Sequence, residues 1–416
     1  MTHSIKINNG PTILVEPMPH LHSVSTGIWA KAGSAAETPE LSGVSHFLEH
    51  MLFKGTEKRS ALDIAAAMES LGGVLNAFTG KEYTCYYTRS LDEHFEQSVE
   101  LLADMYAHSL LDPDEFAREK NVIIEEINMY EDSPDDVVVD LLAASLWPEH
   151  PYGRPIAGSI ESVEALTREQ LALYWAQQYS ADATVVAVAG NVSVAQVEET
   201  VRRYFPVSAI TLPQPGTVPP EQPGTSAFIS KDIEQTHVCM GFPGIGIHDE
   251  DYYPAQILVN ALGGGASSRL FQEIREKRGL SYSAYAFLDI YSKGGIVAAY
   301  ASTRPAKARE LIKVMAEQIG CIATEGLSEE ELQRNKTQLK GGLLLSMESS
   351  SSVMNRLGRL QLQLERVLPV EETVARLMAV TAADIERISK RLFKPGYLSL
   401  AVVGPEPCVL EAKELF

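Results

Sequence analysis

An internal duplication most constrains the fold of this 416-residue chain. Thr167 and Thr381 each begin a capping-box pattern that starts an amphipathic helix. Each helix is followed by an apolar strand pattern that ends in glycine, at Gly190 and Gly404. The two threonines and the two glycines are both 214 residues apart. This shared separation indicates two copies of one structural unit, each of about 200 residues.

A proline-rich stretch separates the two copies. Prolines crowd residues 206–225, which carry almost no charge and show no amphipathic period. Segments of this kind are extended, semi-rigid spacers. We therefore expect one domain over residues 1–205, a linker over 206–225 and a homologous domain over 226–416.

The hydrophobic periodicity of the first half predicts helices and strands that do not alternate strictly. Strands are expected at residues 5–8, 13–16, 24–29, 74–79 and 84–89, and helices at 42–54, 60–71, 92–110, 113–131 and 134–147. This grouping favours the α+β class: two duplicated α/β-sandwich domains, each an antiparallel-rich sheet covered by helices, joined by the linker.

Charge and cysteine usage narrow the class of protein further. The formal net charge of −20 disfavours nucleic-acid binding, because the phosphates would be repelled. The excess negative charge is compatible with a cationic partner, and the alternative is that it only keeps the protein soluble. No apolar run is long enough to span a bilayer, and residues 1–6 show no signal or transit pattern. The four cysteines are scattered, which fits a reducing compartment. We expect a cytoplasmic protein without a membrane partner.

Residues 43–50, Gly-Val-Ser-His-Phe-Leu-Glu-His, carry the strongest chemical signal. On a helix, His46 and His50 are four residues apart and project from one face, with Glu49 immediately before the second histidine. Two imidazoles suit a divalent metal, here expected to be zinc, and the adjacent carboxylate is free to act as a base. A surface helix that happens to carry two histidines is the alternative.

Two histidines do not complete a catalytic zinc site, which usually has three protein ligands and water. The predicted helix at 113–131 offers Glu119 and Glu126, which share a face bordering its buried side. A carboxylate beside an apolar stripe needs a partner, and a metal would supply one. A solvated acidic helix face is the alternative interpretation of this pair.

The duplication supplies an internal test of this hypothesis. Aligning the two halves puts Gln256, Asn260 and Gly342 opposite the two histidines and Glu126. All the proposed ligands are thus lost together in the second copy, which indicates a function held by the first half only.

Residues 46–56, His-Phe-Leu-Glu-His-Met-Leu-Phe-Lys-Gly-Thr, resemble the inverzincin metallopeptidases. This family includes insulysin, pitrilysin and the mitochondrial processing peptidase. The separation between His50 and Glu126 also matches the family. The length and the duplication resemble its short branch, with subunits like those of the processing peptidase.

The resemblance implies a role for each residue of the first half. His46, His50 and Glu126 would bind one zinc ion per chain, and Glu49 would be the general base. Glu119 would lie behind the ligands and orient the site.

The resemblance also assigns functional residues outside the metal motif. Arg275 and Tyr282, seven residues apart, would project from the second domain into the active site and bind the substrate and the oxyanion. Asn76, Ala77 and Phe78 resemble part of an edge strand to which an extended peptide would add as a further strand.

These expectations together describe a zinc-dependent endopeptidase. Its substrate would be a peptide or unfolded segment, bound as an added strand between the two domains. A homodimer is expected by resemblance, with a heterodimer as the alternative. Two other functions stay open: a non-catalytic partner or assembly subunit of a processing-peptidase-like complex, and a peptide-binding clamp that is indifferent to chelators.

Overall fold

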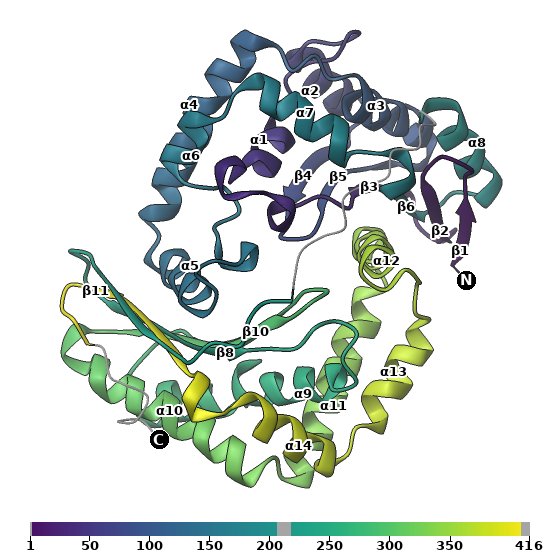
Figure 1. Cartoon of the computed structure of the whole chain (residues 1–416). Helices are drawn as coiled ribbons and strands as arrows, with labels where there is room; N and C mark the ends of the chain where they lie inside the picture. Colours follow the sequence, from purple (N-terminus) through teal and green to yellow (C-terminus); the bar gives the residue numbers. More distant parts are fainter. Residues whose placement is uncertain (1, 206–217, 409–416) are drawn as a thin grey trace. The chain divides into compact units, whose positions relative to one another are not determined.

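The computed structural model describes residues 2–205 and 218–408, which form two compact units (Figure 1). Of the described residues, unit 1 takes 2–127, 155–205 and 344–368, and unit 2 takes 128–154, 218–343 and 369–408. Each unit therefore includes a segment from the other half of the sequence. Two unit boundaries fall within helices, one in α4 (Pro113–Glu131) and one in α11 (Glu329–Ser346).

A mixed sheet forms the centre of unit 1. Its strands are β1 (His3–Lys6), β2 (Thr12–Pro17), β3 (Ser23–Ala30), β4 (Val74–Thr79), β5 (Thr84–Leu91) and β6 (Thr184–Gly190). Within the described residues their order is β1-β2-β6-β3-β5-β4, so β4 lies at one edge. Among these described strands β2 and β6 pair in parallel, and every other neighbouring pair is antiparallel.

Helices pack on both faces of this sheet. They are α1 (Val44–Met51), α2 (Ala61–Ser70), α3 (Phe95–His108), α4 (Pro113–Glu131), α6 (Ile160–Ala165), α7 (Arg168–Gln178), α8 (Val194–Tyr204) and α12 (Ser350–Leu364). The apolar run of β6 is buried on both sides: Val186 and Val188 join the core beneath α1 and α3, and Val185 and Ala187 face α12. The side chains of a strand alternate between the two faces, which explains why this strand has no polar face.

Unit 2 repeats this topology. Its strands are β7 (Ser226–Ser230), β8 (Thr236–Pro243), β9 (Ala284–Ile290), β10 (Gly295–Thr303) and β11 (Ser399–Gly404), in the order β7-β11-β8-β10-β9. Here β7 and β11 pair in parallel, as β2 and β6 do in unit 1, and the other neighbouring pairs are antiparallel. Apart from β1, the described sheets match strand for strand, which confirms the predicted duplication and the α+β class.

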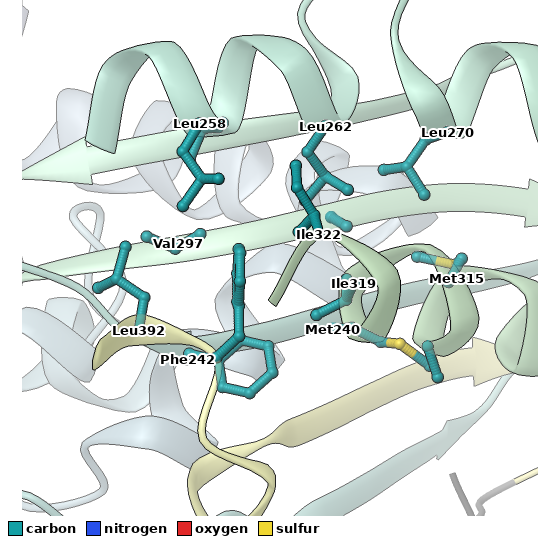
Figure 2. Close-up of a cluster of buried hydrophobic side chains, with 14 of the residues drawn as sticks. Met240, Phe242, Leu258, Leu262, Leu270, Val297, Met315, Ile319, Ile322 and Leu392 are labelled. Carbon is teal, nitrogen blue, oxygen red and sulfur yellow. The ribbon is translucent and has the colours of Figure 1, made fainter. Parts of the chain in front are cut away.

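The helices of unit 2 cover a large apolar core (Figure 2). They are α5 (Pro134–Leu146), α9 (Tyr252–Gly263), α10 (Ala308–Glu325), α11 (Glu329–Ser346), α13 (Val370–Ala379) and α14 (Ala382–Leu392). In this core Phe242 and Val297 from the sheet lie among Leu258 of α9, Ile319 of α10 and Leu392 of α14.

The two sequence halves exchange one helix each. Helix α12, from the second half, packs on β3 and β6 of unit 1, and α5, from the first half, packs on β8 and β11 of unit 2 (Figure 1). The compact units therefore do not coincide with residues 1–205 and 226–416. In the predicted linker, residues 206–217 lie outside the described part, and 218–225 contain no helix or strand.

The predicted elements of the first half agree in kind with the structure and differ at their ends. The helices expected at 113–131 and 134–147 are α4 and α5, with almost the predicted bounds. The helix expected at 42–54 is shorter, because α1 spans Val44–Met51 and a turn follows it. Among the described residues no helix combines the length and the apolarity that a membrane span requires.

Candidate metal centre

Helix α1 presents two histidines because its other side is anchored in the core of unit 1. Its buried residues are Val44, Ser45, Phe47, Leu48 and Met51. Phe47 stacks on Phe116 of α4, with ring centroids 4.6 Å apart and planes 5° from parallel. This stacking fixes α1 against α4, the helix that carries the third candidate ligand.

A buried carboxylate caps the start of α1. Gly43 occupies the left-handed region, with a φ of 92°, and offers no capping side chain. The Glu37 carboxylate instead accepts hydrogen bonds from the backbone N–H groups of Gly43 and Ser45, each at 2.8 Å. A negative charge at this end stabilises the helix. Glu37 was not predicted from the sequence, because it precedes the helix by seven residues and matches no local capping motif.

Three ligand atoms converge between α1 and α4. His46 Nε2 and His50 Nε2 lie 3.3 Å apart, and Glu126 Oε2 lies 3.7 Å from the first and 3.4 Å from the second. Within residues 2–205 and 218–408 this is the one group of three histidine, cysteine or acidic side chains placed to hold a metal ion.

These separations fit a zinc ion. A tetrahedral ion with bonds of about 2.0–2.1 Å places its ligand atoms roughly 3.3–3.4 Å apart. Two imidazole nitrogens and one carboxylate form a typical catalytic donor set, with a fourth position left for water or substrate. The side chains are partly exposed, at 12% for His46, 21% for His50 and 31% for Glu126, so solvent reaches the site.

Glu119 connects the His50 ring to Lys54. The Nδ1 atom of His50 lies 2.8 Å from Glu119 Oε1, and the Nζ atom of Lys54 lies 2.6 Å from Glu119 Oε2. The predicted orienting carboxylate thus contacts one of the two histidines. The ring of His46 differs, because its buried Nδ1 has no hydrogen-bond partner among the described residues.

A residue of the edge strand β4 contacts the proposed base, Glu49. The Thr79 hydroxyl at the end of β4 donates a hydrogen bond to Glu49 Oε2. Burial raises the pKa of Glu49, and this hydrogen bond opposes the shift. Neither Thr79 nor Lys54 was predicted from the sequence, because neither position carries a motif that points to its long-range partner.

The pKa values of the two histidines shift in opposite directions. Burial lowers the pKa of His46 to about 4, and the neighbouring His50 charge adds to this effect. Burial also opposes protonation of His50, but hydrogen bonds to Glu119 and Glu126 outweigh it and raise the pKa of His50 to about 9. His50 therefore keeps its proton to a higher pH than His46 does.

Unit 2 keeps the scaffold of this site with neutral side chains. Asn335 lies 216 residues after Glu119, which is also the separation of Gly342 from Glu126. Asn260 donates to Asn335 Oδ1 at 2.6 Å, in the place of the contact between His50 and Glu119. Amides form this hydrogen bond without charge, so α9 and α11 keep the contact although neither Asn260 nor Asn335 is a histidine or a carboxylate.

The structure brings Arg275 and Tyr282 together within unit 2. Arg275 lies in a π-helical segment, Phe271–Lys277, and its guanidinium carbon is 4.1 Å from the ring centroid of Tyr282 and 4.8 Å from that of Phe271. Tyr282 is 80% exposed. The role of this pair in an active site stays a prediction.

The predicted substrate strand, β4, lies at the sheet edge, but its side chains have other partners. Ala77 packs against the core under α1, and Phe78 packs against Trp29, with ring centroids 5.6 Å apart. The exposed Asn76 accepts a hydrogen bond from the Ala77 N–H at 2.8 Å. A peptide that adds to this edge would therefore meet backbone groups, and would displace the Asn76 side chain from that N–H.

Two family models match the chain in sequence order. Residues 12–160 match the insulinase family, peptidase family M16, and residues 165–339 match the M16 peptidase inactive domain. An uncharacterized zinc protease of Bacillus subtilis, YmxG, is 40% identical over 95% of this chain and 97% of its own length. An uncharacterized zinc protease of Streptomyces coelicolor, SCO5738, is 38% identical over 95% of this chain and 88% of its own length.

Solved structures share the fold at lower sequence identity. A protease from Helicobacter pylori superposes with a TM-score of 0.93 at 23% identity, over 97% of this chain and 99% of that one. A Pseudomonas fluorescens structure described as a peptidase M16 inactive domain gives 0.90 at 22% identity, over 99% of both chains. With its matched domains and its zinc-protease relatives, the chain belongs to the insulinase family of peptidases, M16.

Proposed function

We propose that this protein is a zinc-dependent endopeptidase that cleaves peptides or unfolded segments. The observation that carries the proposal is the convergence of His46, His50 and Glu126, with Glu49 beside them on the same helix. The relatives named zinc proteases support it.

Each residue of the centre would perform a distinct task. The two imidazoles and Glu126 would hold zinc, which when bound polarises a peptide carbonyl and acidifies water. Glu49, oriented by Thr79, would accept a proton at its carboxylate and return it to the leaving amine. A raised pKa suits a group that must both take up and release a proton near neutral pH.

The substrate would bind as an extended strand along β4. Backbone pairing at a sheet edge is largely independent of side-chain sequence, which suits a peptidase of broad specificity. Arg275 and Tyr282 are proposed to assist from the second domain. We further propose a cytoplasmic location, supported by the four free cysteines, and a homodimer, with a heterodimer as the alternative.

A second candidate is a non-catalytic partner subunit. The Pseudomonas fluorescens structure, which matches over 99% of both chains, is described as an inactive domain. Against this candidate stands the convergence of His46, His50 and Glu126 in unit 1, which a non-catalytic subunit would not need.

Substituting Glu49→Gln separates the two candidates. We expect the variant to bind one zinc per chain and to lose nearly all cleavage of a fluorogenic peptide, because the amide cannot accept the proton. Zinc is measured by elemental mass spectrometry and turnover by fluorescence, with and without a chelator.

Glu125→Gln is the matched control, because it removes the same charge from an exposed position beside Glu126. It should keep full activity. Wild-type protein that contains zinc and cleaves no peptide from a diverse mixture would favour the partner subunit.

A further inference from the structure

We propose that Lys54 is a positioning residue of the metal centre and acts on His50 through Glu119. This inference rests on the proposed zinc site and extends it to a residue without direct contact to the ligand atoms.

Lys54 is placed by the same turn that ends the metal-binding helix. Its backbone N–H donates to Met51 O at 3.1 Å, and the N–H of Phe53 donates to His50 O at 3.2 Å. Gly55 follows with a φ of 122°, a conformation that other residues rarely adopt. Lys54 and His50 are therefore fixed to one rigid backbone segment, and the Lys54 side chain reaches back toward Glu119.

Glu119 is held at both oxygens. Its side chain is 5% exposed, and its Oε1 faces His50 Nδ1 while its Oε2 faces Lys54 Nζ. Two contacts on opposite oxygens fix the plane of the carboxylate, and with it the orientation of the imidazole. The path from Lys54 to the ligand atom thus consists of two short, charged hydrogen bonds.

Removing the ammonium group would have two effects of opposite sign on zinc binding. A buried carboxylate oxygen would lose its partner, so Glu119 would turn toward water and release the His50 ring. Loss of an outer partner of a metal ligand weakens metal binding roughly 10–100-fold. Removing a positive charge near a dication would instead strengthen binding. Weaker zinc binding would therefore indicate that Lys54 positions His50, and tighter binding would indicate that only its charge matters.

The test measures the zinc dissociation constant of purified, metal-stripped protein by competition with a chelator of known affinity. We expect Lys54→Met to weaken zinc binding at least about tenfold and Lys54→Arg to restore most of it, because arginine keeps a charged donor. In cobalt-substituted protein, the visible absorption bands should change in Lys54→Met and recover in Lys54→Arg.

Lys58→Met is the matched control for charge. Lys58 follows in the same segment, is 61% exposed, and pairs with Glu100 and Asp104 at 3.6 and 3.8 Å. Its loss removes an equal charge without touching Glu119, so zinc affinity should stay within about twofold of wild type. Circular dichroism of each variant checks that the fold is retained.

A double substitution tests whether Lys54 acts on His50 through Glu119. If Lys54 acts through Glu119, then Lys54→Met should add little to the effect of Glu119→Gln. Equal or tighter zinc binding by Lys54→Met, with wild type binding one zinc, would overturn this inference and leave the proposed function intact. Wild-type protein that binds no zinc would overturn both.

Discussion

At the scale of single residues, the two histidines of α1 differ in what surrounds them. His50 lies between Glu119 and Glu126, whereas His46 has an unpartnered buried Nδ1 within the described residues. The imidazole between two carboxylates keeps its proton to a higher pH than its neighbour. Because a metal binds only the neutral ring nitrogen, a zinc ion at the proposed site would compete with a proton for His50.

Zinc binding should therefore release about one proton per chain at pH 7.5, because the pKa of His50 is raised to about 9. Zinc affinity should rise with pH up to that value and flatten above it. Calorimetric titrations in buffers of different ionisation enthalpy measure the number of protons released.

The raised pKa of His50 also makes the stability of the metal-free protein depend on pH. A pKa raised above the unfolded value of about 6.5 stabilises the fold below that pH, and the contribution is lost as the pH rises through about 9.

The Glu119→Gln variant is the control for the predicted proton release, because it removes one of the hydrogen bonds that raise the pKa of His50. It should release fewer protons; an unchanged count would contradict this assignment.

At the scale of elements, small residues decide where the exchanged helix α12 packs. A Cβ atom at Gly358 would lie 2.2 Å from the buried Trp29 ring, and one at Gly27 of β3 would lie 2.4 Å from Met354 Sδ. Two glycines on facing surfaces thus allow a helix and a tryptophan to interlock. Neither glycine is required for its backbone conformation, so the constraint comes from packing.

We expect Gly358→Ala to destabilise the protein by about 1–3 kcal/mol, because the added methyl group overpacks the core against Trp29. This outcome opposes the helix propensity of alanine, which alone would stabilise by roughly 1 kcal/mol. Denaturant unfolding measures the difference.

Gly341→Ala is the matched control within a helix. A Cβ at Gly341 of α11 meets nothing within 4 Å, so this change should stabilise the helix by about 1 kcal/mol. Equal changes in the free energy of unfolding for Gly358→Ala and Gly341→Ala would show that the close contact with Trp29 does not restrict residue 358 to glycine.

At the scale of the whole molecule, the exchange of α5 and α12 makes each unit depend on both halves of the sequence. Without α12, the face of the first sheet formed by Leu14, Trp29 and Val185 would lose its cover. Exposing a large apolar side chain costs about 1.5–3 kcal/mol, and a domain is stable by only about 5–15 kcal/mol.

A fragment of residues 1–205 should therefore be poorly soluble or unfolded alone. Co-expression with residues 206–416 should restore it as a complex that co-purifies through a tag on one fragment. A second fragment with Gly358→Val, which crowds Trp29 more strongly, should recover less of its partner. A well-folded, cooperatively unfolding 1–205 fragment would contradict this prediction.

The sequence alone determined the local features of this protein: the duplication, the α+β class, the helices from Pro113 to Leu146, and the spacing that puts His46 and His50 on one face. Periodicity and capping are short-range properties, so a linear pattern records them. The family resemblance singled out Glu126, because its separation from His50 is itself a sequence feature.

Only the tertiary structure decided which distant groups meet. Glu37 at the start of α1, Thr79 at Glu49 and Lys54 at Glu119 are contacts between elements, and none has a signature in its own neighbourhood. The exchange of α5 and α12 escaped prediction for the same reason: an amphipathic helix needs a partner face, and its pattern does not state which sheet supplies that face.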